Sequence, residues 1–295
     1  MFVAVVHAAV LLAQVAAGLL YSPAPALWLR AYLELSAALC AGVLGASLLA
    51  RAACSRLGAR LQPTAAPSSA LAEALESCRA MVVFAGFAAW PRMLLALGRP
   101  TALHFSLADA QPEAPASVAL YCAKLLAVTL LTDAYMYFKH RLLHQGPLFV
   151  WHKKHHSFPN PSPLASFAVA PVEAVLTFWP VLFLCLPQAP VWAHAYALWT
   201  AGFVALNLYL HSGVRVEGLE TALSAVGLNS SSFHNLHHES GGSTNYGELL
   251  YIWDYMLGSG AHPPAPAPAA KGGAAAAKGA AARRPARAAS TGRGR

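Results

Sequence analysis

Histidine is the residue type through which this sequence could do the most chemistry. Eight of its 13 histidines fall into three short clusters, H-R-L-L-H, H-K-K-H-H and H-N-L-H-H. On a helix, residues three and four apart share a face, so each cluster can point two rings at one site. The clustered residues are His140, His144, His152, His155, His156, His234, His237 and His238.

Imidazole binds a metal ion as a neutral base through one ring nitrogen, while the other nitrogen usually donates to a nearby acceptor. One tetrahedral ion needs four ligands, so eight clustered rings predict two ions. Two ions about 4 Å apart are an established catalytic arrangement. The ligand type alone leaves zinc, copper, iron and nickel open. Four of the five isolated histidines are predicted not to bind metal: His7, His104, His194 and His262.

The composition indicates a membrane protein. Hydrophobic residues make up 57% of the chain and charged residues 11%, whereas a soluble domain carries about 25% charged residues. A helix needs about 20 mostly apolar residues to cross a bilayer. Six segments approach that length: residues 1–20, 27–50, 80–98, 117–138, 169–186 and 191–210. Pro91 and Arg92 interrupt the third, and the last two are predicted to form a hairpin around Pro187 and Pro190.

Charges between the segments predict the orientation of the chain. Four arginines lie between the second and third segments, whereas the loop at residues 100–117 carries Asp109 and Glu113. By the positive-inside rule, the N-terminus, the histidine clusters and the C-terminal tail are expected on the cytosolic side. The 77 residues between His156 and His234 are enough for the hairpin to bring the third cluster back to the first two. The basic residues beside the first two clusters could dock an acidic partner, or act simply as positive-inside charge: Lys139, Arg141, Lys153 and Lys154.

Four motifs follow one another within residues 133–258: D-A-Y-M-Y-F-K-H-R-L-L-H, W-H-K-K-H-H, F-H-N-L-H-H and N-Y-G-E-L-L-Y-I-W-D-Y-M-L-G. Together they resemble the fatty acid hydroxylase/sterol desaturase superfamily. The gap of seven residues between His144 and His152 fits that superfamily, since the gap in acyl-CoA desaturases is much longer. The stretch at 159–173 is similar to the loop after the second cluster in sterol C5-desaturases. It departs from them at Ala170 and Glu173, where those enzymes more often show His and Asp.

The resemblance implies a di-iron centre with the eight clustered histidines as ligands and O2 as the oxidant. It also implies electrons from NAD(P)H through a cytochrome b5-type carrier. It adds His211, in L-H-S-G, as a further candidate ligand. Asp133 lies two turns before His140 and could orient a ligand ring, and no catalytic residue beyond the metal ligands is predicted. Three residues match the closing motif and could serve packing as well as chemistry: Asn245, Trp253 and Asp254.

The sequence therefore predicts an all-α, multi-pass transmembrane protein with a cytosolic-side di-metal site. Residues 1–116 are expected to form a membrane-spanning region, and residues 117–260 a fatty acid hydroxylase-like catalytic domain. Residues 261–295, rich in Ala, Pro and Gly, are expected to be a disordered basic tail. This tail carries seven of the basic residues and no acid, so the net charge of +8 gives no support to a nucleic-acid partner. Five widely spaced cysteines without a C-x-x-C argue against disulfides or a thiolate zinc site.

The expected activity is the hydroxylation or desaturation of a lipid in the endoplasmic reticulum membrane. The favoured substrate is a sterol. The alternatives are the hydroxylation of a fatty-acyl chain, a sphingolipid or a carotenoid. Two other classes of protein stay open. One is a non-enzymatic membrane protein that holds zinc, and the other is a bis-histidine haem protein, although eight clustered ligands exceed what haem needs.

Overall fold

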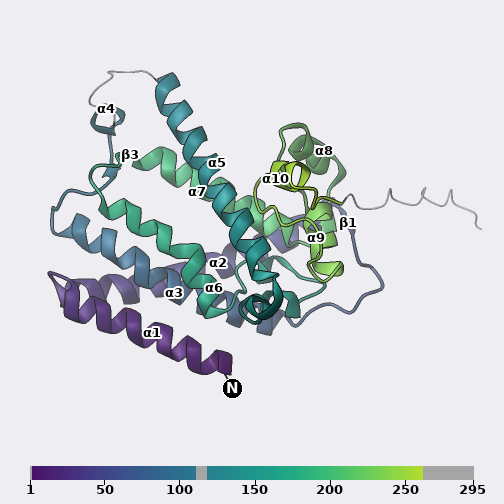
Figure 1. Cartoon of the computed structure of the whole chain (residues 1–295), viewed down its shortest axis with the longest axis horizontal. Helices are drawn as coiled ribbons and strands as arrows, with labels where there is room; N and C mark the ends of the chain where they lie inside the picture. The colour runs from purple at the N-terminus through teal and green to yellow at the C-terminus, as the bar shows by residue number, and fades with distance from the viewer. Residues whose placement is uncertain (1, 111–117, 262–295) are drawn as a thin grey trace, which may run out of the picture. The chain divides into compact units, whose positions relative to one another are not determined.

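Long helices dominate the fold of the chain (Figure 1). A computed structural model describes residues 2–110 and 118–261. The long helices are α1 (Phe2–Tyr21), α2 (Pro25–Leu57), α3 (Ala70–Ala96), α5 (Val118–Leu143) and α7 (Ala193–Leu210). The short helices are α4 (Leu107–Ala110), α6 (Pro171–Phe178), α8 (Glu217–Ala225), α9 (Ser231–Glu239) and α10 (Ile252–Met256). Four 3-10 helices are η1 (Gly146–Trp151), η2 (His155–Ser157), η3 (Pro163–Ala165) and η4 (Trp179–Cys185).

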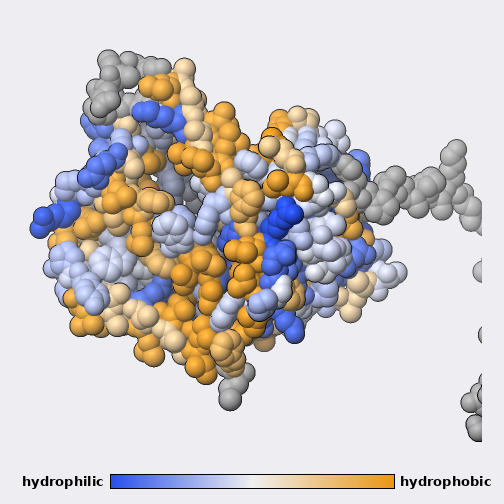
Figure 2. All heavy atoms as spheres, viewed as in Figure 1, coloured by the Kyte–Doolittle hydropathy of each residue, from blue (hydrophilic) through white to orange (hydrophobic). Residues whose placement is uncertain are grey.

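Within the described residues, four helices are long and apolar enough to cross a membrane: α1, α2, α3 and α5. Figure 2 shows the apolar side chains on the surface of α1 and along α5, where a bilayer would cover them. The prediction of a multi-pass helical membrane protein is confirmed. The third span starts at Ala70, ten residues earlier than the apolar segment, because the Ser69 hydroxyl accepts from the Ala72 N–H and caps the helix. Pro91 lies inside α3, and the helix continues past it.

The fifth predicted span needs correction. It forms α6 followed by the 3-10 helix η4, and the apolar stretch Pro171–Cys185 is too short to count as a spanning helix. Pro180 follows the first residue of η4 and has no N–H to continue the α-helical ladder, which explains the change of helix type. The sixth segment forms α7, and its 18 residues are not among the candidate spans.

The hairpin itself is present, and two-residue strands hold its two ends. At the turn, β2 (Leu103–His104) pairs with β3 (Val191–Trp192), and the Ala102 N–H donates to the Leu184 carbonyl. At the other end, β1 (Ala59–Arg60) pairs with β4 (Val214–Arg215) directly after α7. The chain therefore leaves the end of the bundle that carries the histidine clusters and returns to it.

The N-terminal helices support the loop that follows the second cluster. The Ser47 hydroxyl of α2 donates to the Pro163 carbonyl, and the Ser77 hydroxyl of α3 donates to the Leu164 carbonyl. The buried Glu73 carboxylate accepts from both the backbone N–H and the hydroxyl of Ser162. A buried carboxylate without such partners would be costly, so these bonds fix the loop to α2 and α3. The predicted boundary between residues 116 and 117, and all of the predicted tail beyond Ala261, fall outside the described residues.

Candidate metal centre

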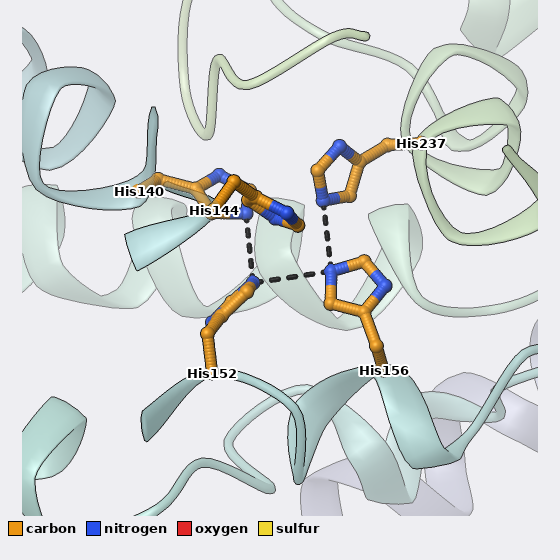
Figure 3. A group of neighbouring side chains, drawn as sticks. All are labelled: His140, His144, His152, His156 and His237. Carbon is orange, nitrogen blue, oxygen red and sulfur yellow. Dashed lines mark hydrogen bonds between the residues drawn. The ribbon is translucent and has the colours of Figure 1, made fainter. Parts of the chain in front are cut away.

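Nine histidines converge at one end of the helices and form two groups. Within each group, one nitrogen of every ring lies within 4.8 Å of the corresponding nitrogens of the others. The first group, drawn in Figure 3, contains His140, His144, His152, His156 and His237. The second group contains His155, His211, His234 and His238. All eight clustered residues and His211 are therefore brought together. His7, His104 and His194 lie outside both groups, and His262 lies outside the described residues.

The second and third clusters divide their rings between the two groups. His156 belongs to the first group and its neighbour His155 to the second; His237 and His238 divide in the same way. His234 and His238, four residues apart on α9, stay together, with Nε2 atoms 3.2 Å apart. Adjacent side chains on a helix or 3-10 turn point in different directions, so one short segment can serve two sites. The two groups lie against each other, since the ring centroids of His156 and His238 are 5.0 Å apart.

Backbone carbonyl acceptors fix how three of these rings are protonated. The Nδ1 atoms of His140 and His237 lie 2.7 and 2.6 Å from the backbone carbonyl oxygens of Tyr246 and Thr244. A carbonyl oxygen only accepts, so each Nδ1 must donate, and a neutral ring then has a bare lone pair on Nε2. His211 is held in the same way by the Asn207 carbonyl, at 2.9 Å.

Glu173 does the same for His152. The His152 Nδ1 lies 2.8 Å from both carboxylate oxygens, and both side chains are buried. A carboxylate behind an imidazole orients the ring and makes its other nitrogen a stronger ligand. Burial raises the pKa of Glu173 to about 8, an effect that Lys139 opposes; a cation at the far side of the His152 ring would lower this pKa further.

The donor set fits metal ions. The Nε2 atoms of His140 and His152 lie 3.0 Å apart. With Glu173 ionised, both atoms carry lone pairs, so the contact is then not a hydrogen bond between them. Similar contacts of 3.0 to 3.2 Å link other rings of the two groups, and those of the first group are dashed in Figure 3. Ligand nitrogens at about 2.0–2.1 Å from one ion lie roughly 3.0–3.4 Å apart. A cation between the lone pairs would turn a repulsive arrangement into a favourable one.

Burial keeps the rings neutral, as metal ligation requires. It lowers the pKa of His144 to about 4 and that of His156 to about 3. The pKa of His211 falls to about 4 for the same reason. At neutral pH these rings offer nitrogen lone pairs rather than positive charge.

The expectation for Asp133 needs correction, because its carboxylate does not orient a ring. It accepts from the backbone N–H groups of Leu249 and Leu250 and from the Trp253 indole. These bonds fasten the closing motif to α5. The residue that orients a ring is Glu173, which the sequence analysis had noted only as a departure from a related family. A lone carboxylate in the otherwise apolar stretch V-A-P-V-E-A-V-L was the available signal.

The closing motif shapes the backbone that reaches the rings. The Asp254 carboxylate accepts from the N–H groups of Tyr246 and Gly247. Asn245 adopts a positive φ of 59°, and its side-chain amide donates to the Phe233 carbonyl. This bent segment presents the carbonyls of Thr244 and Tyr246 to His237 and His140. Asn245 and Asp254 thus hold this backbone segment in place, while the Trp253 indole donates to Asp133.

A small cavity of about 60 Å³ adjoins both histidine groups. Its wall includes His140, His152 and His211, the apolar residues Met136 and Phe178, and the buried Lys139. The Lys139 ammonium donates to Thr177 and pairs with Glu248 at 3.2 Å. Lys139 therefore does not belong to an exposed basic surface. The expectation that it could help to dock an acidic partner is corrected.

Comparison with known proteins supports the family resemblance of the four motifs. The fatty acid hydroxylase family model matches residues 125–259. A methylsterol monooxygenase of Aspergillus fumigatus is 28% identical over 172 residues, covering 55% of this chain and 55% of that protein. A Delta(7)-sterol 5(6)-desaturase of Gibberella zeae is 31% identical over 136 residues, covering 44% of this chain and 35% of its own. A lathosterol oxidase of Rattus norvegicus is 31% identical over 146 residues, covering 47% and 45%.

The chain thus spans about half or less of the length of these curated relatives. No solved structure matches it. The matched region contains all nine converging histidines and the closing motif. The four motifs, the family match over residues 125–259 and the similarity to methylsterol monooxygenase and sterol desaturases together support the fatty acid hydroxylase/sterol desaturase superfamily.

Proposed function

We propose that the chain is a membrane-embedded oxidoreductase that holds two iron ions and uses O2 to hydroxylate or desaturate a sterol. The observation that carries the proposal is the set of imidazole nitrogens that face one another at 3.0 to 3.2 Å. The sterol is proposed because relatives named as a methylsterol monooxygenase and sterol desaturases match this region. Fatty-acyl, sphingolipid and carotenoid substrates are the alternatives within the same superfamily.

The proposed ligands are the five rings of the first group and the four rings of the second group, which include His211. When bound there, a pair of iron ions supplies what side chains lack, the reductive activation of O2 toward an unactivated C–H bond. The protein's own residues orient the rings: Glu173 and the carbonyls of Thr244, Tyr246 and Asn207 accept the Nδ1–H groups. Phe178 and Met136 line the adjoining cavity and would keep water away from the reacting carbon.

The reaction needs an electron donor in either form. Hydroxylation places one oxygen atom in the C–H bond and reduces the other to water; desaturation takes two hydrogens from the lipid and reduces both oxygens to water. Each consumes two electrons and two protons from outside, for which we propose NAD(P)H through a cytochrome b5-type carrier. Lys153 is exposed beside the second cluster and suits an acidic carrier. We place this end of the molecule on the cytosolic side of the endoplasmic reticulum membrane.

Two measurements on the purified protein and its host test the proposal. Metal analysis is expected to give two iron ions per chain, whereas zinc alone would indicate the non-enzymatic alternative, and a Soret band would indicate haem. Expression in cells that lack a sterol desaturase or methyl oxidase, followed by lipid profiling, is expected to restore the missing sterol product.

A pair of histidine variants makes the test specific. His155→Ala removes one ring of the second group and is expected to abolish the product while the protein still inserts. His194→Ala removes a histidine at the start of α7, outside both groups, and is expected to leave the product unchanged. Equal product from both variants would overturn the ligand assignment.

A further inference from the structure

A large apolar cavity lies beside the histidine site, between α5, α7 and α8. Its volume is about 670 Å³, within the range of about 300–1,000 Å³ typical of small-molecule sites. Leu125 and Leu126 line it from α5, Trp199 and Leu206 from α7, and Leu223 from α8. We call this cavity the lipid bay.

The lipid bay offers no free hydroxyl to a ligand. Thr129 and Tyr209 are the lining residues with hydroxyls. The Thr129 hydroxyl donates to the Leu125 carbonyl, and the Tyr209 hydroxyl donates to Glu220. Among the described residues, no charged side chain lines it, and its remaining polar groups are the Trp199 indole and the Cys122 thiol. A ligand with several polar groups would lose water there for few partners, so the bay suits a hydrocarbon body.

Phe203 stands between the lipid bay and the small cavity at the histidines. Among the residues that line the two cavities, it is the one common to both. Trp199 and Leu206 lie on the bay side of α7, while Asn207 and Leu210 lie on the histidine side. Positions three and four apart share a helix face, which places Phe203 on the edge where the two faces meet. Its ring stacks on Trp199, with centroids 6.0 Å apart and planes 12° apart.

The closing motif marks the same boundary from the other side. Glu248 lines the small cavity, and the next residue, Leu249, lines the lipid bay. The chain bends at these two residues, and their side chains enter different cavities. The bay is therefore contiguous with the proposed reaction site, with one aromatic ring and one turn of backbone between them.

We propose that the lipid bay receives the hydrocarbon body of the lipid substrate from the membrane between α5 and α7, and that Phe203 sets how far the lipid reaches toward the histidines. This inference rests on the proposed function and names where its substrate lies. A lipid has to come to the site sideways from the bilayer, and α5, a candidate span, forms one wall of the bay. Phe203 is here a specificity-determining residue, since its size decides which carbon comes next to the rings.

Gly202 gives a way to fill the lipid bay without disturbing the fold. It lines the bay, and a Cβ placed on it meets no atom within 4 Å. Gly202→Trp is therefore expected to fold and to occupy the space. Gly45→Trp is the matched control, because Gly45 lies in the span α2, away from the bay, and is equally free of neighbours.

The test is photolabelling in vesicles with a diazirine-bearing sterol, followed by peptide mapping. The wild-type protein is expected to be labelled on α5 and α7 within the lipid bay. Gly202→Trp should reduce that label about tenfold or more, while Gly45→Trp should keep it and both variants should keep the wild-type metal content. Label outside the bay, or label that Gly202→Trp leaves unchanged, would overturn the proposal.

Phe203→Ala tests the second half of the inference. Removing the ring is expected to join the two cavities, so that label also appears at Met136 or Asn207, which line the small cavity. An unchanged labelling pattern would refute the role of Phe203. If a diazirine-bearing fatty acid labels the bay and the sterol does not, the bay stands as a lipid site and the sterol assignment fails. Since labelling needs no turnover, a protein without iron that still labels in the bay would overturn the proposed function and leave the bay standing as a lipid site.

Discussion

Gly242 is the position where one added methyl group should disturb the metal centre most directly. It follows the third cluster in the loop E-S-G-G-S, has a φ of +78°, and its N–H donates to the His237 carbonyl. A Cβ built on Gly242 would lie 1.9 Å from the Cε1 atom of His144. Since an ordinary contact begins at 3.4 Å, Gly242→Ala must move the His144 ring or the loop by about 1.5 Å.

Gly241→Ala is the matched control for this change. Gly241 also has a positive φ, +67°, but a Cβ there meets nothing within 4 Å. Both substitutions cost about 1–2 kcal/mol for placing alanine in the left-handed region, so the backbone strain cancels in the comparison. The difference between the two variants reports the displacement of the His144 ring.

The expected magnitude follows from the tolerance of such sites. Catalytic groups must be held within about 0.5 Å, and a misplacement of about 1 Å can cost roughly 100-fold in rate. Gly242→Ala is therefore expected to weaken metal binding in the first group by about 10- to 100-fold, and turnover by about 100-fold. Gly241→Ala should match the wild type in bound metal and differ from it only in thermal stability. Metal titration with mass spectrometry under native conditions, together with product analysis, measures both effects.

A double variant makes the reasoning refutable. If Gly242→Ala acts by displacing the His144 ring, it should have no further effect on metal binding once that ring is removed by His144→Ala. The effects of substitutions at residues in contact do not simply add. Full additivity of the two losses, or equal metal binding by Gly241→Ala and Gly242→Ala, would refute the proposed contact.

Three further changes test the surroundings of the rings. His211→Ala should lower the metal content of the second group, since that group has four rings; a chain that keeps its full metal content would remove His211 from the ligand set. Glu173→Leu should weaken metal binding by about 10- to 100-fold by leaving the His152 N–H without an acceptor, whereas Glu173→Gln, whose amide oxygen can still accept, should lose less; equal losses would point to a role of charge alone. Asp133→Asn should lower stability by about 1.5–3 kcal/mol, because its carboxylate accepts from two backbone N–H groups and the Trp253 indole. The melting temperature in detergent measures this loss of stability. Trp253→Phe should lower the stability of the Asp133→Asn variant by less than it lowers that of the wild type.

The sequence alone determined the class of protein and the residues of the candidate site. Apolar segments of nearly bilayer length predict helices from local composition, and α1, α2, α3 and α5 follow. Spacings of three and four place rings on one face within each cluster, and all eight clustered histidines converge. These features depend on near neighbours in the chain, so a local pattern contains them. His211 came from resemblance to a family, since one histidine in L-H-S-G has no periodic signal of its own.

Tertiary structure decided how the rings are divided and held. Whether His155 or His156 joins His152 depends on a 3-10 turn, which the spacing leaves open. Two of the acceptors behind the rings come from distant segments: Tyr246 lies 106 residues from His140, and Glu173 lies 21 residues from His152. From the sequence, Lys139 is expected to be a surface charge. In the structure it is buried, where it forms an ion pair with Glu248 and donates a hydrogen bond to Thr177. Directions of hydrogen bonds and burial arise only when distant segments pack together, and a pattern of near neighbours cannot encode them.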